Sequence, residues 1–200
     1  SSRSPAPTGA AATRAGRRTL AAKAIDDGLA GMAAGTTPGI VNVAGALARA
    51  QMAMEEGDNA RVAALLEHKD YGPWTVLTVE KEEFKPFKTG PLATATATAG
   101  LRYFIETEQS DKAVQAMKKL EQLAGDAGAE ASAKLTAMYQ AMGRDLQAQL
   151  MSLASGPSAG TPEAQKRAAT ILTGFEKFLE GVAKDPKLSS QMWAATTYLN

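Results

Sequence analysis

The stretch that most constrains the fold of this chain runs from Ala44 to Leu66 and has the pattern of two helices joined by a tight turn. Its apolar side chains recur three and four residues apart on both sides of a polar break, which is the spacing of one helix face. These side chains are Leu47, Ala50, Met54, Val62, Leu65 and Leu66. Gly57 can adopt the left-handed conformation that ends a helix, and Asp58 or Asn59 can cap the next one. The stretch therefore predicts a helical hairpin.

The residues of this hairpin resemble the tetratricopeptide repeat, whose unit is a helical hairpin of about 34 residues with small side chains where its helices touch. Ala50 falls where the repeat has a small Gly or Ala, and Gly57 and Asp58 fall where it turns. Val62 falls at the second small position, and Leu66 takes the place of an aromatic residue. The resemblance implies an all-α fold in which such hairpins stack on one another.

A similar pattern returns at residues 94–123, where apolar residues flank the polar break Glu108-Gln109-Ser110. The apolar residues are Leu101, Phe104 and Ile105 before the break, and Ala113, Met117 and Leu120 after it. Ala113 stands at the second small position of the repeat. The resemblance thus covers roughly half of the chain. It implies antiparallel helical hairpins stacked as a tetratricopeptide-like α-solenoid, with one non-helical insert between them.

The insert occupies residues 71–91, where β-branched and aromatic residues replace alanine. Gly72-Pro73 marks a turn at its start, and Gly90-Pro91 closes it. A segment of this length without helix is long for a compact domain, so we expect it to be ordered and functional or to hold short strands. Trp74 and Phe84 are expected to anchor it onto the helices, and a ligand contact is the alternative role.

Helical spacing and helix breakers divide the remaining sequence. Thr94–Ala99 alternates with the period of a strand, but the turn at Pro91 and the apolar residues that follow favour a helix. At the break Gly35–Gly39, Thr37 is expected to cap a helix and Pro38 to occupy its first position. The predicted segments are a flexible tail at residues 1–9, a helical repeat domain at 10–200, helices at 10–34, 111–124 and 130–152, a linker at 155–160, a helix from Pro162 capped by Thr161, and a last helix at 188–200.

Composition narrows the class of protein further. The chain has 200 residues and 44% hydrophobic residues, which suits one domain or two small ones with a substantial core, and we expect one domain. Its formal net charge is +1, so no long-range field would concentrate nucleic acid on its surface. The first thirty residues are locally basic and could touch a membrane or phosphate, but Asp26-Asp27 follow and favour a solvated helix face. No apolar run approaches the roughly eighteen residues needed to span a bilayer, so we expect no membrane insertion.

The chain has few residues that carry catalytic or metal chemistry. It has no cysteine and one histidine, His68, so it lacks the side chains of disulfides, cysteine-histidine zinc sites and thiol nucleophiles. His68 lies near a helix end, where we expect it to cap carbonyls or face solvent rather than to act in a triad. The acidic pairs Asp26-Asp27, Glu55-Glu56 and Glu82-Glu83 are expected to lie in solvent. We therefore expect no enzyme activity, no cofactor and no metal.

The family resemblance implies a partner. Stacked helical hairpins form a concave groove that holds a peptide or another protein. The groove positions of the family fall on Leu47, Gln51, Met54, Thr98, Arg102 and Ile105, and Trp74 of the insert is added to these candidates. The lysine and asparagine with which some family members clamp a peptide's terminal carboxylate are not reproduced at Leu47 and Gln51, so an apolar or mixed partner is expected. Arg102 is the one obvious anion contact.

The sequence therefore predicts a protein- or peptide-binding scaffold or assembly module. The alternative is a fragment or accessory domain of a larger enzyme whose active site lies outside this chain. Because the chain begins at Ser1 and stops inside a helical pattern at Asn200, we expect a piece of a longer protein. Its alanine-rich, cysteine-free composition favours a bacterial, periplasmic origin.

Overall fold

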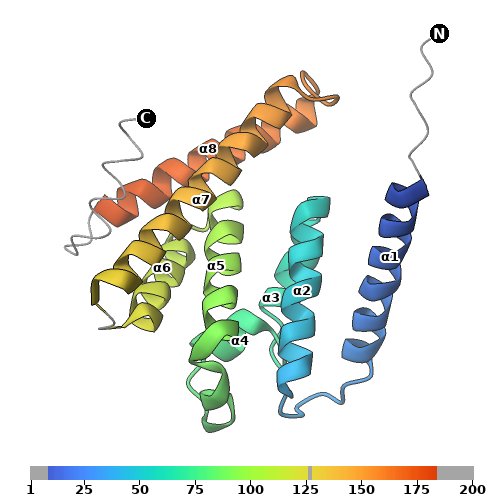
Figure 1. Cartoon of the computed structure of the whole chain (residues 1–200), viewed down its shortest axis with the longest axis vertical. Coiled ribbons are helices and arrows are strands. Elements are labelled where there is room, and N and C mark those ends of the chain that lie inside the picture. Colours follow the sequence, from blue (N-terminus) through green and yellow to red (C-terminus); the bar gives the residue numbers. More distant parts are fainter. Residues whose placement is uncertain (1–8, 126–127, 184–200) are drawn as a thin grey trace. The chain divides into compact units, whose positions relative to one another are not determined.

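The structure is a computed structural model that describes residues 9–125 and 128–183, and all regular secondary structure in these ranges is helical (Figure 1). The predicted all-α class is confirmed for this part of the chain. The helices are α1 Gly9–Ala30, α2 Ile40–Glu56, α3 Asn59–Leu66, α4 Pro73–Thr78, the 3-10 helix η1 Glu82–Phe87, α5 Gly90–Glu106, α6 Ser110–Ala124, α7 Gly128–Ser155 and α8 Pro162–Ala183. The chain divides into two compact units, Ser1–Glu83 and Phe84–Asn200.

The first unit is built on the predicted hairpin, which is formed by α2 and α3. Helix α1 packs on α2, and α4 packs on both α2 and α3. Gly57 ends α2 with φ 74°, and the Asp58 carboxylate accepts a hydrogen bond of 3.0 Å from the amide of Arg61. The fully buried Ala46 and Ala50 let neighbouring helices approach α2 closely. The predicted hairpin and its turn are therefore confirmed.

The prediction that residues 71–91 lack helix is wrong, because α4, η1 and the first turn of α5 lie there. Pro73 has its fixed φ at the first position of α4, where its missing amide hydrogen costs nothing. Trp74 and Leu77 are buried, so packing overrides their weak helix propensity. Phe84 is also buried, at 1% exposure, so the prediction that both aromatic residues are anchors is confirmed.

The predicted cap of α2 is wrong in its residues. The helix begins at Ile40, and Gly39 rather than Thr37 is the residue that precedes it. The side chain of Asn42 turns back and accepts a hydrogen bond of 3.1 Å from the amide of Gly39. Asn42 therefore replaces the threonine cap, and Pro38 lies outside the helix.

The second unit contains a second hairpin, α5 and α6, with α8 packed against both and α7 packed on α6 and α8. The segment Thr94–Ala99 is helical, as predicted. The hydroxyls of Thr94 and Thr98 donate to the carbonyls of Gly90 and Thr94, at 3.2 and 2.8 Å, which satisfies these side chains within the helix. The buried Thr96, Ala97 and Gly100 form the small-residue face toward the neighbouring helices.

Helix α8 passes very close to the C-terminal end of α5. A Cβ atom built on Gly174 would lie 1.9 Å from the carbonyl oxygen of Ile105, so no larger residue fits there without movement. Beside this crossing, Glu108 has φ 59° and its carboxylate pairs with the Lys177 ammonium at 2.9 Å. The crossing of α5 and α8 therefore depends on one glycine.

The remaining breaks follow the sequence. Gly125 ends α6 with φ 61°, and α7 ends at Ser155, where the linker is predicted. The Thr161 hydroxyl accepts a hydrogen bond of 3.2 Å from the amide of Ala164 and so caps α8, which begins at Pro162. The tail predicted at residues 1–9 lies, except for its last residue, outside the described residues, and so does the helix predicted at 188–200.

Candidate functional site

Four of the predicted partner-binding residues lie in the first unit. Leu47 and Met54 on α2 and Trp74 on α4 are 5%, 4% and 4% exposed, respectively. Gln51 on α2 is exposed. Three of these four side chains therefore belong to the core of the unit, and Gln51 is the one that a partner can reach directly.

The other three predicted residues lie on α5 of the second unit. Ile105 is fully buried, and Thr98 uses its hydroxyl within the helix. Arg102 Nε donates to the Glu106 carboxylate at 2.8 Å, and Glu106 is 4% exposed. The predicted anion contact thus already has an internal carboxylate. Partner binding by these residues stays a prediction.

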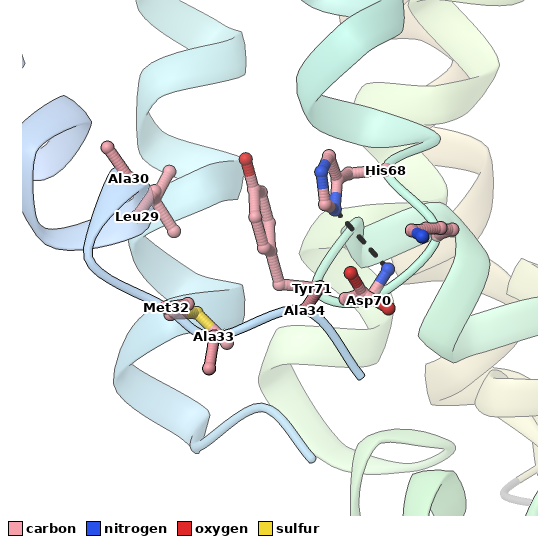
Figure 2. Close-up of a pocket in the computed structure, with 9 residues that line it drawn as sticks. Leu29, Ala30, Met32, Ala33, Ala34, His68, Asp70 and Tyr71 are labelled. Carbon is pink, nitrogen blue, oxygen red and sulfur yellow. Dashed lines mark hydrogen bonds between the residues drawn. The ribbon is translucent and has the colours of Figure 1, made fainter. Parts of the chain in front are cut away.

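A cavity that sequence reasoning missed lies in the first unit, with a volume of about 280 Å³ (Figure 2). It is formed where the C-terminal end of α1 and the segment after it meet the connection between α3 and α4. Its lining residues are Leu29, Ala30, Met32, Ala33, Ala34, His68, Lys69, Asp70 and Tyr71. One wall is therefore apolar and the other carries polar and aromatic groups.

The connection between α3 and α4 holds the polar wall in a tight fold. Gly72 donates its amide to the carbonyl of His68 at 2.8 Å, and a Cβ atom on Gly72 would lie 2.4 Å from the amide nitrogen of His68. Only glycine fits there. The imidazole of His68 stacks on the ring of Tyr71, with 3.8 Å between ring centroids and 9° between planes. The amide of Asp70 donates to Nδ1 of His68 at 3.3 Å, which leaves Nε2 to carry the hydrogen of a neutral ring.

Two acidic residues and a helix end lie at or near the cavity. Burial raises the pKa of the Tyr71 phenol, and the negative charges of Asp26 and Asp70 raise it further. Within the described ranges, the carboxylate of Asp70 forms no ion pair and no hydrogen bond with a side chain. Leu29 and Ala30 belong to the last turn of α1, where the helix dipole places partial negative charge.

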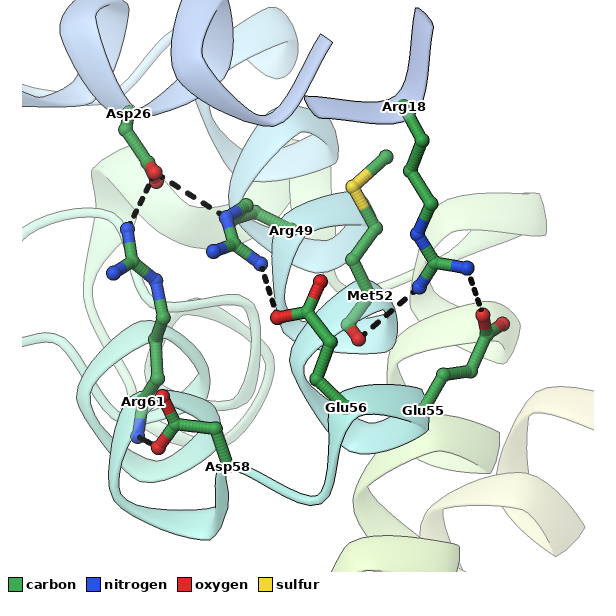
Figure 3. Close-up of polar contacts among 8 residues, drawn as sticks. All are labelled: Arg18, Asp26, Arg49, Met52, Glu55, Glu56, Asp58 and Arg61. Atoms are coloured by element: carbon green, nitrogen blue, oxygen red, sulfur yellow. Dashed lines mark hydrogen bonds and ion pairs between the residues drawn. The ribbon is translucent and has the colours of Figure 1, made fainter. Parts of the chain in front are cut away.

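A network of charges beside the cavity attaches α1 to the hairpin (Figure 3). The Asp26 carboxylate on α1 accepts hydrogen bonds from Arg61 on α3 and, at 3.3 Å, from Arg49 on α2. Arg49 also approaches the Glu56 carboxylate at 3.5 Å, and its side chain is 9% exposed. Burial acts to raise the pKa of Asp26, but the hydrogen bonds and charges of Arg61 and Arg49 outweigh it, and the pKa lies below its usual value. Asp26 is therefore ionised when the unit is folded at neutral pH.

The other end of α1 is held by Arg18. Its guanidinium pairs with the Glu55 carboxylate at 2.6 Å and donates to the carbonyl oxygen of Met52 at 3.3 Å. On the exposed side of α1, Lys23 pairs with Asp27 at 2.5 Å, and this contact raises the pKa of Lys23. The acidic pairs 26–27 and 55–56 are thus engaged by basic residues rather than gathered into an acid-base or metal site.

The described residues supply little else for chemistry. They contain no group of three or more His, Asp or Glu side chains placed to hold a metal ion. Among the helices that they form, none is long and apolar enough to cross a membrane. The pattern that could have pointed to the cavity is His68 and Tyr71 three residues apart, immediately before the Gly72-Pro73 turn.

Comparison of the chain with models of protein families, with curated proteins and with solved structures found no match.

Proposed function

We propose that this chain is a helical module that binds a peptide or a segment of another protein, and that its role is binding rather than catalysis. The observation that carries this proposal is the cavity of about 280 Å³ in the first unit. Cavities that enclose a small-molecule ligand usually have about 300–1,000 Å³. A half-open cavity below this range suits one side chain of a partner, with the rest of the partner lying on the surface around it.

The walls of the cavity support a binding role. The apolar wall, residues 29–34, can take up the stem of a side chain, while Asp70 and Tyr71 offer polar groups at the other wall. A few convergent polar groups in an apolar concave surface are the usual composition of recognition sites. His68 is the one histidine of the chain, and its stacking on Tyr71 gives it a structural part in this wall.

We further propose that the two hairpins are related repeats of the tetratricopeptide type. What supports this is their shared order of buried and exposed positions: residues 41–50 of α2 and residues 91–100 of α5 follow the same sequence of exposed, half-buried and buried side chains. Ala50 and Gly100 end the two patterns, and both are small and buried. The sequences of the two segments differ, so the common pattern lies in packing more than in residue identity.

Selection from a random peptide library tests the binding proposal. We expect peptides that bind the whole chain, and we expect Ala33→Phe to weaken them at least tenfold, since Ala33 is an exposed residue that lines the cavity and phenylalanine would fill it. Ala154→Phe is the matched control, because Ala154 is exposed on α7 in the other unit. Gln51→Ala tests the exposed face of α2.

The outcomes separate the possible sites. Peptides that lose affinity with Ala33→Phe and not with Ala154→Phe support the cavity. Peptides that respond to Gln51→Ala alone would support binding at α2 and contradict the cavity. Failure to select any peptide, with the chain folded by circular dichroism, would refute the proposal.

A further inference from the structure

We infer that the cavity of the first unit accepts a positively charged side chain of the partner, and specifically the guanidinium of an arginine. This inference rests on the proposed function and names the chemistry of the partner. It follows from three features of the cavity, which are the unpaired carboxylate of Asp70, the aromatic ring of Tyr71 and the C-terminal end of α1.

The carboxylate comes from Asp70. It lines the cavity, and no basic side chain in the described part of the chain neutralises it. By contrast, Asp26 of α1, whose charge also acts on Tyr71, is already bound to Arg49 and Arg61. Asp26 is thus paired within the chain, whereas the carboxylate of Asp70 is open to the cavity. A charge-assisted hydrogen bond from a ligand is the interaction that such a carboxylate makes most strongly.

The aromatic ring is that of Tyr71. One face of this ring is covered by His68 at a centroid separation of 3.8 Å. Figure 2 shows the ring between His68 and the segment that carries Leu29 and Met32, so the other face is turned toward the apolar wall. A guanidinium is planar and weakly hydrated, and it stacks on aromatic faces more readily than an ammonium does.

The third feature, the end of α1, favours a positively charged ligand. The last turn of α1 brings the negative end of its dipole to the cavity through Leu29 and Ala30. Burial raises the pKa of Tyr71, and the negative charges of Asp26 and Asp70 raise it further. Lys69 is the one basic residue in the lining, and it is exposed, so its charge lies at the solvent side. An anionic side chain would meet repulsion here.

The test uses nuclear magnetic resonance of the isotope-labelled whole chain with small probes. The probes are acetyl-arginine amide, acetyl-citrulline amide, which has the same shape without the charge, acetyl-lysine amide and acetyl-glutamate amide. We expect arginine to shift the amide signals of residues 30–34 and 69–71. Saturation should correspond to a dissociation constant on the order of millimolar, which is usual for a ligand of this size. Citrulline should bind at least fivefold more weakly, and glutamate should not bind.

Two variants and one control test whether the Asp70 carboxylate binds the charge of the arginine probe. Asp70→Asn should weaken arginine binding at least fivefold and leave the melting temperature unchanged, because the Asp70 carboxylate forms no hydrogen bond or ion pair with a described side chain. Lys69→Ala should strengthen binding, since it removes a competing positive charge. Asp145→Asn is the control, as Asp145 is an exposed acid on α7 in the other unit, and it should have no effect.

Equal binding of arginine and citrulline, or an unchanged affinity in Asp70→Asn, would overturn the inference. Tighter binding of lysine than arginine would overturn the assignment to a guanidinium. If library peptides bind and respond to Ala33→Phe while the arginine probe does not bind, the proposed function stands and the cationic partner is refuted. If the probe binds as expected and no peptide is selected, the proposed function fails and the cationic site remains.

Discussion

Replacing Gly174 by alanine tests whether close contact between α5 and α8 stabilises the second unit. The added Cβ would lie 1.9 Å from the carbonyl oxygen of Ile105 and 3.1 Å from its carbon. Real Cβ contacts are essentially never shorter than 3.0 Å, so α8 must retreat by about 1.1 Å. Because the obstacle is helix backbone rather than a flexible side chain, it cannot turn away.

The magnitude follows from two opposing effects. Overpacking of a tightly packed interior costs about 1–3 kcal/mol, and a backbone obstacle places this substitution at the upper end. Alanine in a helix interior gains about 1 kcal/mol over glycine. The net loss of unfolding free energy is therefore about 2 kcal/mol. For a chain of this length, that corresponds to a melting temperature lower by about 4–8 °C.

The matched control is Gly143→Ala on α7, where an added Cβ meets nothing within 4 Å. Here only the helix preference acts, so the melting temperature should rise by about 2–4 °C. Thermal unfolding of both variants and the parent chain by far-ultraviolet circular dichroism measures the difference. If Gly174→Ala is as stable as Gly143→Ala, the helices do not cross as closely as described and the reasoning is wrong.

Three further predictions concern the first unit and metal dependence. Trp74→Ala should lower the unfolding free energy in urea by about 3–5 kcal/mol, the usual cost of emptying a large aromatic site, while Gln51→Ala should change it little; equal effects would contradict the burial of Trp74. Asp26→Asn should destabilise the unit by about 1–3 kcal/mol at neutral pH, because it removes the charged acceptor of Arg49 and Arg61. Folding lowers the pKa of Asp26, so its contribution to the unfolding free energy is present above the unfolded pKa of about 3.9 and is lost as pH falls through the folded pKa. The stabilities of Asp26→Asn and the parent chain should therefore converge in acid. A difference that stays constant with pH would contradict this. Excess chelator should leave the melting curve unchanged, because the described residues form no metal-binding group, and a drop of several degrees would reveal an overlooked site.

The parts of the fold that could be predicted are those fixed by local signals. Gly57 and Asp58 end one helix and cap the next through their own conformations and hydrogen bonds, so the hairpin followed from sequence. Helix α4 could not be predicted in the same way. Its residues have low helix propensity, and the helix forms because Trp74 and Leu77 are buried against α2 and α3, which only the tertiary structure provides.

The candidate site was harder to predict for a related reason. Helical spacing identifies residues on one face but does not say which face is buried, so Leu47 and Met54 were placed on a binding surface and lie in the core. Residues 30–34 and residues 68–71 line the cavity together, and no local sequence pattern predicts that these two segments meet. The unpaired state of Asp70 is equally a property of the folded unit.

The way α1 is attached has a consequence for the dynamics of the first unit. Over residues 16–30, Leu29 is the one buried side chain of α1, and ion pairs of Arg18 and Asp26 join the helix to α2 and α3. Ion pairs near the surface weaken as salt screens them, whereas the apolar contacts between α2 and α3 do not. Helix α1 should therefore open in a separate, low-energy step whose amide exchange speeds up with ionic strength, while exchange in α2 stays constant. Because the last turn of α1 forms one wall of the cavity, each such opening would also dismantle the cavity, and salt would set the fraction of molecules in which it is formed.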